Sequence, residues 1–121
     1  MKHREITEKI FRGFYTVYNN FGTGFLESVY ENSLLIKLQN SGLKAHSQMP
    51  LSVYYREQVV GEFKADILVN DAVLLELKAV KRIEEVHKAQ LINYLKVTGL
   101  EIGLILNFGN KPDFKRIIFT K

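Results

Sequence analysis

The chain has 121 residues, of which 46% are hydrophobic and 25% are charged, and it contains no cysteine. This composition is typical of a single globular domain that folds without disulfides, and it excludes a zinc–cysteine site. No apolar run approaches the roughly 18 residues of a membrane-spanning helix. The net charge of +4 mildly favours a polyanionic partner, although a solvated surface with a slight lysine excess explains it equally well.

Two helices are expected in the first third of the chain. Residues 4–20 repeat apolar side chains at helical spacing, and the stretch NNFGTG that follows provides a helix stop and a turn. A second helix is expected from about residue 25 to residue 40, closed by Ser41 and Gly42. The charged start of the chain gives no sign of a cleaved signal peptide, so a cytoplasmic protein is expected.

From residue 43 to residue 80 the hydrophobic period changes to two, which predicts strands. The segments LKAHS, LSVYY, VVGEFKADILV and AVLLELKAV are expected to be four separate strands. A third helix is expected over residues 84–98, followed by the strands EIGLILNF and FKRIIFT. Because a helix crosses between two strands, this order predicts one α/β domain over residues 1–121, with a mixed central sheet flanked by helices.

The hairpin within residues 59–80 places charged side chains among apolar ones. Successive strand residues point to opposite faces, and matching the more apolar faces pairs Val69 with Val73 across a three-residue loop. In this register Asp66 lies opposite Glu76, and Lys64 faces Lys78. Two adjacent carboxylates repel each other unless a cation lies between them, and Mg²⁺ suits such a site because it binds a few carboxylate oxygens and keeps water ligands.

A second interpretation of these charges stays open. Glu76 with Lys78, and Asp66 with Lys64, would form ordinary salt bridges on a solvated face of the sheet. The alternation of side chains alone does not choose between a metal site and ion pairs of this kind.

Several motifs resemble a known family. Asp66 followed by Glu76-Leu77-Lys78 is similar to the D…(D/E)xK signature of the PD-(D/E)xK nuclease superfamily, although Ala65 stands where that signature has proline. GFLESVY, which contains Gly24, Glu27 and Tyr30, resembles the motif that names the GxxExxY protein family, and the resemblance extends over roughly residues 5–119. It implies a restriction-endonuclease-like αβββαβ core with an extra N-terminal helix.

The resemblance also implies an active site. Asp66 and Glu76 would bind Mg²⁺ or Mn²⁺ together with the Leu77 carbonyl, and Glu27 would be the helical acid that helps to hold the metal or its water shell. Lys78 would position or deprotonate the attacking water and stabilise the charge that develops on the phosphate. Gln90 and Tyr94 match the Q-x3-Y element of RecB-like nucleases, which lines the same site.

Each of these side chains also has a structural explanation. Glu27 suits the first turn of any helix, and Gln90 with Tyr94 suits a buried polar contact. Tyr30 is expected to pack in the core, and Gly24 is expected to permit a tight turn. His87, one turn before Gln90, is a further neighbour of the site.

Three functions remain in competition at this level. The first is a metal-dependent nuclease that hydrolyses phosphodiester bonds in nucleic acid, with DNA favoured as substrate. The second is a catalytically silent module on the same fold that binds nucleic acid or protein. The third is a structural subunit in which IGLILNF or the N-terminal helix serves assembly, and a homodimer is possible under any of them.

Overall fold

The computed structural model describes residues 3–120. Its elements, in chain order, are α1 (Arg4–Phe21), α2 (Glu27–Asn40), β1 (Ala45–Tyr55), β2 (Gln58–Val69), β3 (Val73–Lys78), α3 (Glu85–Thr98), β4 (Ile102–Phe108) and β5 (Pro112–Ile118). All three helices predicted from periodicity are present, each within two residues of the expected bounds. In the described part of the chain no helix combines the length and apolarity needed to cross a membrane.

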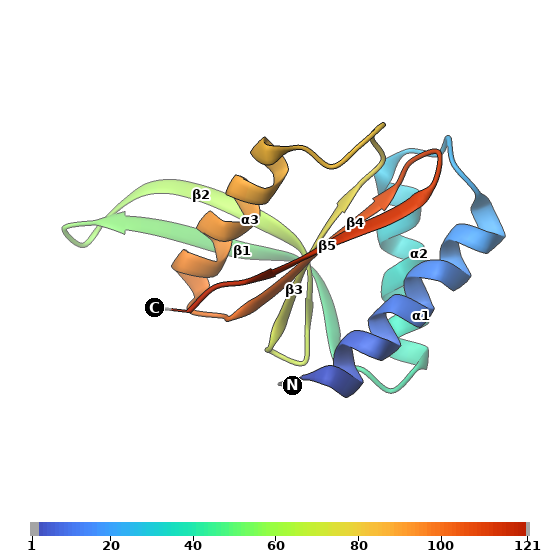
Figure 1. Cartoon of the computed structure of the whole chain (residues 1–121). Coiled ribbons are helices and arrows are strands. Elements are labelled where there is room, and N and C mark those ends of the chain that lie inside the picture. Colours follow the sequence, from blue (N-terminus) through green and yellow to red (C-terminus); the bar gives the residue numbers. More distant parts are fainter. Residues whose placement is uncertain (1–2, 121) are drawn as a thin grey trace.

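The five strands form one mixed sheet in the order β1-β2-β3-β4-β5. β3 and β4 are parallel, whereas the other three pairs of neighbours are antiparallel. The parallel pair requires a crossover connection, which α3 provides. Helices α1 and α2 lie on one side of the sheet and α3 lies on the other (Figure 1). The predicted mixed sheet flanked by helices is therefore confirmed.

Two hydrophobic cores result from this layering. The larger one lies under α1 and α2 and is built around Phe14, Tyr30 and Phe108, and the smaller one lies under α3 around Leu91 and Leu95. Strand β4 is buried along its whole length because both faces of the sheet are covered there. The prediction that IGLILNF serves assembly is therefore wrong, since every residue of this strand is buried inside the domain.

β1 is one continuous strand, so the prediction of two strands separated by Gln48, Met49 and Pro50 is also wrong. These residues lie inside β1, and Pro50 is paired with Lys64 of β2. β1 is an edge strand, where proline is tolerated because half of the backbone N–H groups need no partner. Gln48 has a φ of 55°, which marks a local irregularity in the strand.

The β2–β3 hairpin has the predicted register. Val69 pairs with Val73, and the loop residues Asn70 and Asp71 have φ values of 53° and 52°. The ladder, however, ends after the pair Ile67–Leu75. Because the ladder does not extend to Lys64, this residue is paired with Pro50 of β1 but not with Lys78 of β3, which corrects that part of the prediction.

Candidate active site

The site begins where the β2–β3 ladder ends. The backbone N–H of Asp66 donates a hydrogen bond to Glu76 Oε2 at 2.8 Å, and the backbone N–H of Leu77 donates one to Asp66 Oδ2 at 2.7 Å. Each carboxylate thus replaces a backbone carbonyl as the acceptor for an amide of the opposite strand. Within residues 3–120 these are the only hydrogen bonds of the two carboxylates, so Asp66 Oδ1 and Glu76 Oε1 are available to a ligand.

Burial makes the negative charge of both groups unfavourable. Burial and, after it, the neighbouring Asp66 charge together raise the pKa of Glu76, which is 5% exposed, to about 8. Burial, with a smaller contribution from the charge of Glu31, raises the pKa of Asp66 to about 6. Two carboxyl groups held together with raised pKa values are a favourable site for a cation, because a cation stabilises their ionised forms.

The salt-bridge interpretation does not describe this site. Among the described residues, no ion pair joins Glu76 to Lys78 or Asp66 to Lys64. Lys78 is half-buried at the end of β3, and its positive charge opposes the effect of burial on the pKa of both carboxyl groups. Lys78 therefore lies close enough to act on the same charges without neutralising them by direct contact.

Two acids of α2 lie near the pair, and one of them was missed by sequence reasoning. Glu31 accepts two hydrogen bonds from Gln48 Nε2, at 2.9 and 3.1 Å, and after burial its charge contributes to the raised pKa of both Asp66 and Glu76. Glu27, the predicted acid, is exposed, and its charge contributes only to the raised pKa of Asp66. The signal that could have found Glu31 is its position one helical turn after Glu27.

The GFLESVY motif fixes the start of α2. The buried Tyr30 hydroxyl donates to the Gly22 carbonyl at 2.6 Å and accepts from the Phe25 N–H at 3.2 Å, and its ring stacks on Phe108. Gly24 has a φ of 109°, which other residues adopt only with strain. Tyr30 packs in the core and Gly24 permits the turn, as predicted, and together they orient the helix that carries both acids.

Helix α3 carries the other predicted side chains, Gln90 and Tyr94. Gln90 Nε2 donates to the Tyr94 hydroxyl at 3.0 Å. Burial raises the pKa of Tyr94, and the charge of Glu76 raises it further, so the ring lies within electrostatic range of the carboxylates. His87 has a different role, because its Nδ1 accepts the Glu84 N–H and completes a capping box at the start of α3.

The chain beyond Lys78 is held by β4. The buried side chain of Asn107 accepts the Val80 N–H and donates to the Val80 carbonyl, both at 2.9 Å. Gly109 lies against the same carbonyl, and a Cβ at this position would lie 2.2 Å from the Val80 oxygen. These contacts fix where the segment between β3 and α3 leaves the sheet.

The carboxylate oxygens of Asp66 and Glu76 are of the chemical type that binds a hard divalent cation. Carboxylate oxygens are the ligands that Mg²⁺ and Mn²⁺ prefer, and Asp66 and Glu76 each keep one such oxygen available. In the described part of the chain, no three acidic or histidine side chains are already gathered closely enough to surround an ion. Asp66 and Glu76 would therefore hold a metal with water or substrate oxygens as the remaining ligands.

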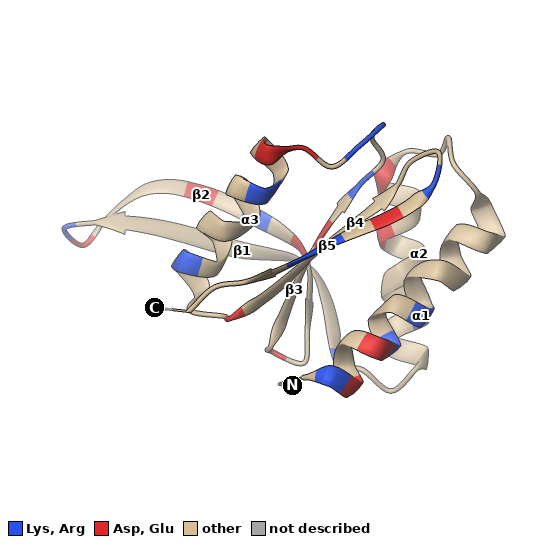
Figure 2. Cartoon of the chain, in the orientation of Figure 1, with Lys and Arg blue, Asp and Glu red and all other residues tan. Residues whose placement is uncertain are grey.

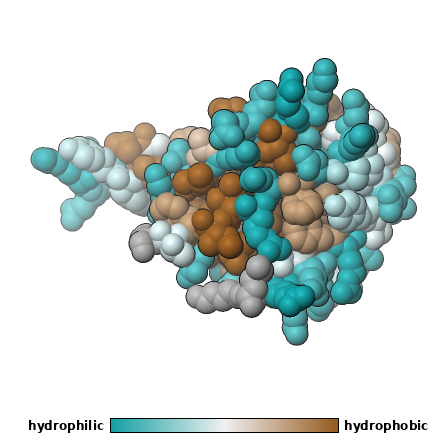
Figure 3. All heavy atoms as spheres, in the orientation of Figure 1, coloured by the Kyte–Doolittle hydropathy of each residue, from teal (hydrophilic) through white to brown (hydrophobic). Residues whose placement is uncertain are grey.

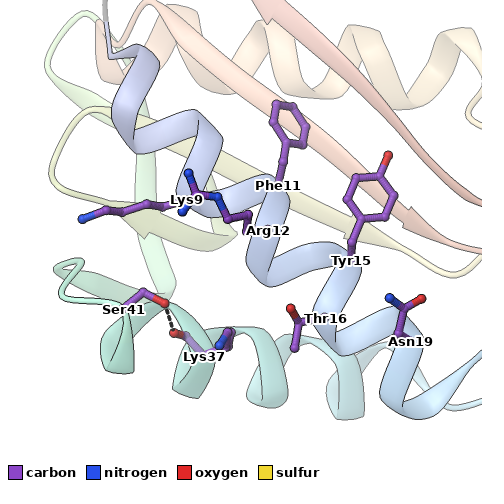
Figure 4. Close-up of a pocket in the computed structure, with 8 residues that line it drawn as sticks. All are labelled: Lys9, Phe11, Arg12, Tyr15, Thr16, Asn19, Lys37 and Ser41. Atoms are coloured by element: carbon purple, nitrogen blue, oxygen red, sulfur yellow. Dashed lines mark hydrogen bonds between the residues drawn. The ribbon is translucent and has the colours of Figure 1, made fainter.

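Two of the surface grooves lie beside helices. One of about 620 Å³ lies between α3 and the β1–β2 hairpin and includes Gln90 and Tyr94 in its lining. The other, of about 560 Å³, lies between α1 and α2 and is lined by Lys9, Arg12 and Lys37 (Figure 4). None of these three cations forms an ion pair within residues 3–120, and no residue of the second groove belongs to the carboxylate site.

The arrangement of sheet, helices and carboxylates defines a restriction-endonuclease-like domain. The chain resembles the crystal structure of SSO0001 with a TM-score of 0.61 and 17% sequence identity, over 78% of this chain and 50% of SSO0001. It thus spans half the length of that protein. A structure of Archaeoglobus fulgidus Hjc, a Holliday junction resolvase from an archaeal hyperthermophile, matches at 18% identity over 74% of this chain and 73% of Hjc, with a TM-score of 0.47.

The family is identified from the sequence. Residues 4–117 match the PD-(D/E)XK nuclease superfamily, and the chain belongs to it. No curated protein matches the sequence. The resemblance seen in the D…ExK signature is thereby confirmed at the level of the superfamily.

Proposed function

We propose that this protein is a metal-dependent nuclease that hydrolyses phosphodiester bonds in nucleic acid, with DNA as the favoured substrate. One observation carries the proposal. Where β2 and β3 separate, Asp66 and Glu76 each accept a backbone N–H of the opposite strand, and Lys78 follows them on β3. Membership of the nuclease superfamily supports it. GFLESVY supports the narrower placement in the GxxExxY family, which is part of the proposal.

Each side chain has a role in this mechanism. Asp66 and Glu76 would hold Mg²⁺ or Mn²⁺, the Leu77 carbonyl would be a further ligand beside water or substrate oxygens, and Glu27 and Glu31 of α2 would orient the water ligands. Such an ion polarises the phosphoryl oxygen and lowers the pKa of bound water. Lys78 orients the attacking water and stabilises the negative charge that develops on the phosphate. Gln90 and Tyr94, joined by their hydrogen bond, border the same space and position the substrate strand.

Cleavage of plasmid and single-stranded DNA in Mg²⁺ or Mn²⁺ tests the proposal. Wild type should cleave at least one of them, and Lys78→Ala should lower the rate by about a hundredfold or more, the magnitude of one lost charge-stabilising donor. Lys37→Ala is the matched control, because it removes a cation from the groove between α1 and α2. Equal cleavage rates for Lys78→Ala and Lys37→Ala would show that Lys78 has no role in catalysis. A wild-type protein that cleaves neither DNA would contradict the proposed nuclease function.

Calorimetry with Mn²⁺ separates the nuclease from a catalytically silent binding module. A nuclease site requires metal binding that Asp66→Ala and Glu76→Ala abolish. Binding of nucleic acid that is indifferent to both substitutions, with no metal uptake, would support the silent module instead.

A further inference from the structure

The groove between α3 and the β1–β2 hairpin is lined largely by apolar side chains. Its hairpin wall is formed by Leu51, Val53 and Phe63, and its helix wall includes Gln90, Asn93 and Tyr94. The hairpin protrudes beyond the rest of the sheet and carries hydrophobic side chains on its surface (Figures 1 and 3). Its exposed apolar residues include Tyr54, Tyr55, Val59 and Val60.

Two aromatic rings form the centre of this groove. The rings of Phe63 and Tyr94 lie 5.9 Å apart between centroids, at an interplanar angle of 47°. Phe63 is 47% exposed, so part of its ring is open to a ligand. Gly61 makes room for that ring, because a Cβ at position 61 would lie 3.1 Å from Phe63 Cε2. The hairpin thus holds an aromatic ring against the groove at a fixed place.

Two residues of the groove lining are also predicted residues of the candidate active site. Gln90 and Tyr94 line the groove, and after burial the charges of Glu76 and Asp66 raise the pKa of Tyr94. The groove lining also includes Asn93 and Lys96, and the ammonium group of Lys96 lies 5.9 Å from the centre of the Phe119 ring. A ligand in the groove therefore meets apolar surfaces, amide groups and the side chain of one lysine.

We propose that this groove binds the unpaired bases of a nucleic-acid strand next to the phosphate that is cleaved. This inference rests on the proposed function and names its substrate class. Unpaired bases stack on aromatic rings, their edges form hydrogen bonds with amide side chains, and a lysine accommodates the adjoining phosphate. Bases within a duplex keep their stacking partners, so the groove selects single strands, overhangs or flaps.

Binding measured without catalysis tests the groove. Fluorescence anisotropy with a labelled single-stranded oligonucleotide and with a blunt duplex of the same sequence, both in EDTA, gives two affinities for each variant. Phe63→Ala and Phe63→Leu should each weaken single-strand binding by about tenfold, because one base–aromatic stack is lost. Blunt-duplex binding should be unchanged. Phe63→Leu keeps an apolar side chain, so it separates stacking from general hydrophobic contact.

The matched control is Tyr55→Ala, which removes an exposed aromatic ring from the same hairpin but outside the groove. It should leave both affinities unchanged, and thermal melting of each variant checks that the fold is retained. Wild-type affinity in Phe63→Leu, or equal losses on single strand and duplex, would overturn the inference. So would a dimer in size-exclusion chromatography that Phe63→Ala converts to monomer, because a second copy would then occupy the groove.

The cleavage assay distinguishes this inference from the proposed function. Phe63-dependent binding of single strands by a protein that cuts no substrate would support the groove while removing the nuclease. Metal-dependent cleavage with identical single-strand affinities for wild type and Phe63→Ala would support the nuclease while removing the groove.

Discussion

Asp66 and Glu76 hold each other in place through backbone amides of the opposite strand. The Asp66 N–H donates to Glu76, and the Asp66 carboxylate accepts from the residue that follows Glu76. The carboxylates therefore complete the hydrogen bonding of the sheet at the point where the strands part, and also present free oxygens to a ligand. Amide replacements keep the acceptors and remove the charge, so they isolate the electrostatic effect better than alanine does.

The stability of the metal-free protein should fall as pH rises. Burial raises the pKa of Glu76 from 4.5 to about 8 and that of Asp66 from 3.8 to about 6. Between these values the folded protein holds protons that the unfolded chain has released, so the free energy of unfolding decreases as pH increases. The melting temperature in EDTA should therefore be lower at pH 8.5 than at pH 5.

Glu76→Gln tests whether the buried pair causes this pH dependence. In the variant the melting temperature should decrease much less between pH 5 and pH 8.5, and at pH 8.5 it should be higher than that of wild type. Glu57→Gln, an exposed acid in the β1–β2 turn, is the control. The assignment of the slope to the buried pair would be contradicted if Glu76→Gln and wild type melted in parallel across the range.

Divalent metal should reverse the effect of alkaline pH. An ion bound by Asp66 and Glu76 stabilises only the folded state, so the melting temperature at pH 8.5 should rise with the Mn²⁺ concentration. Asp66→Asn keeps an acceptor for the Leu77 N–H but loses a charged ligand, so it should show little of this rise. A full metal-induced shift in that variant would place the ion elsewhere.

Glu31 should matter to the reaction at least as much as Glu27. It acts electrostatically on both carboxyl groups, whereas Glu27 acts on Asp66 alone. Glu31→Gln should lower the cleavage rate by about tenfold or more, as is typical when groups that orient metal ligands are removed. Gln48→Ala, which frees the Glu31 side chain, should lower it in the same direction. A larger loss of cleavage rate for Glu27→Gln than for Glu31→Gln would instead support Glu27 as the helical acid, as the GFLESVY motif predicts.

The Tyr30 hydroxyl should contribute measurably to stability. Tyr30→Phe leaves the Gly22 carbonyl and the Phe25 N–H without this partner, which should lower the free energy of unfolding by about 1–3 kcal/mol. Urea denaturation measures the change. Tyr15→Phe is the matched control, because Tyr15 is 38% exposed and its hydroxyl forms no hydrogen bond within residues 3–120. Equal effects of the two substitutions would oppose the role of Tyr30.

Much of the fold follows from short-range pattern in the sequence. Helical spacing predicts all three helices, and matching apolar faces predicts the pairing of Val69 with Val73. The same reasoning brought Asp66 and Glu76 together. It succeeded because a buried hairpin permits few registers, and a shift of one residue would expose its apolar side chains.

The sequence pattern failed where the side chains of β2 switch from one face of the sheet to the other. Ala65 packs in the core under α3 whereas Ile67 packs under α1 and α2, although alternation predicts one common face. The change falls at Asp66, opposite the irregularity at Gln48 in β1. That irregularity also brings Gln48 to Glu31, and no local pattern reveals a contact between residues that are distant in sequence.

Asn107 extends the parallel pairing of β3 and β4 beyond its last backbone bond. Paired with Lys78 in the ladder, it reaches Val80 with its amide and satisfies both backbone groups there, as a further strand residue would. An uncharged residue of β4 thereby anchors the end of β3 that carries Lys78. The position of Lys78 and its chemical identity are thus set by different strands, so substitutions in β4 can shift the lysine while every ionisable group of the candidate site is kept.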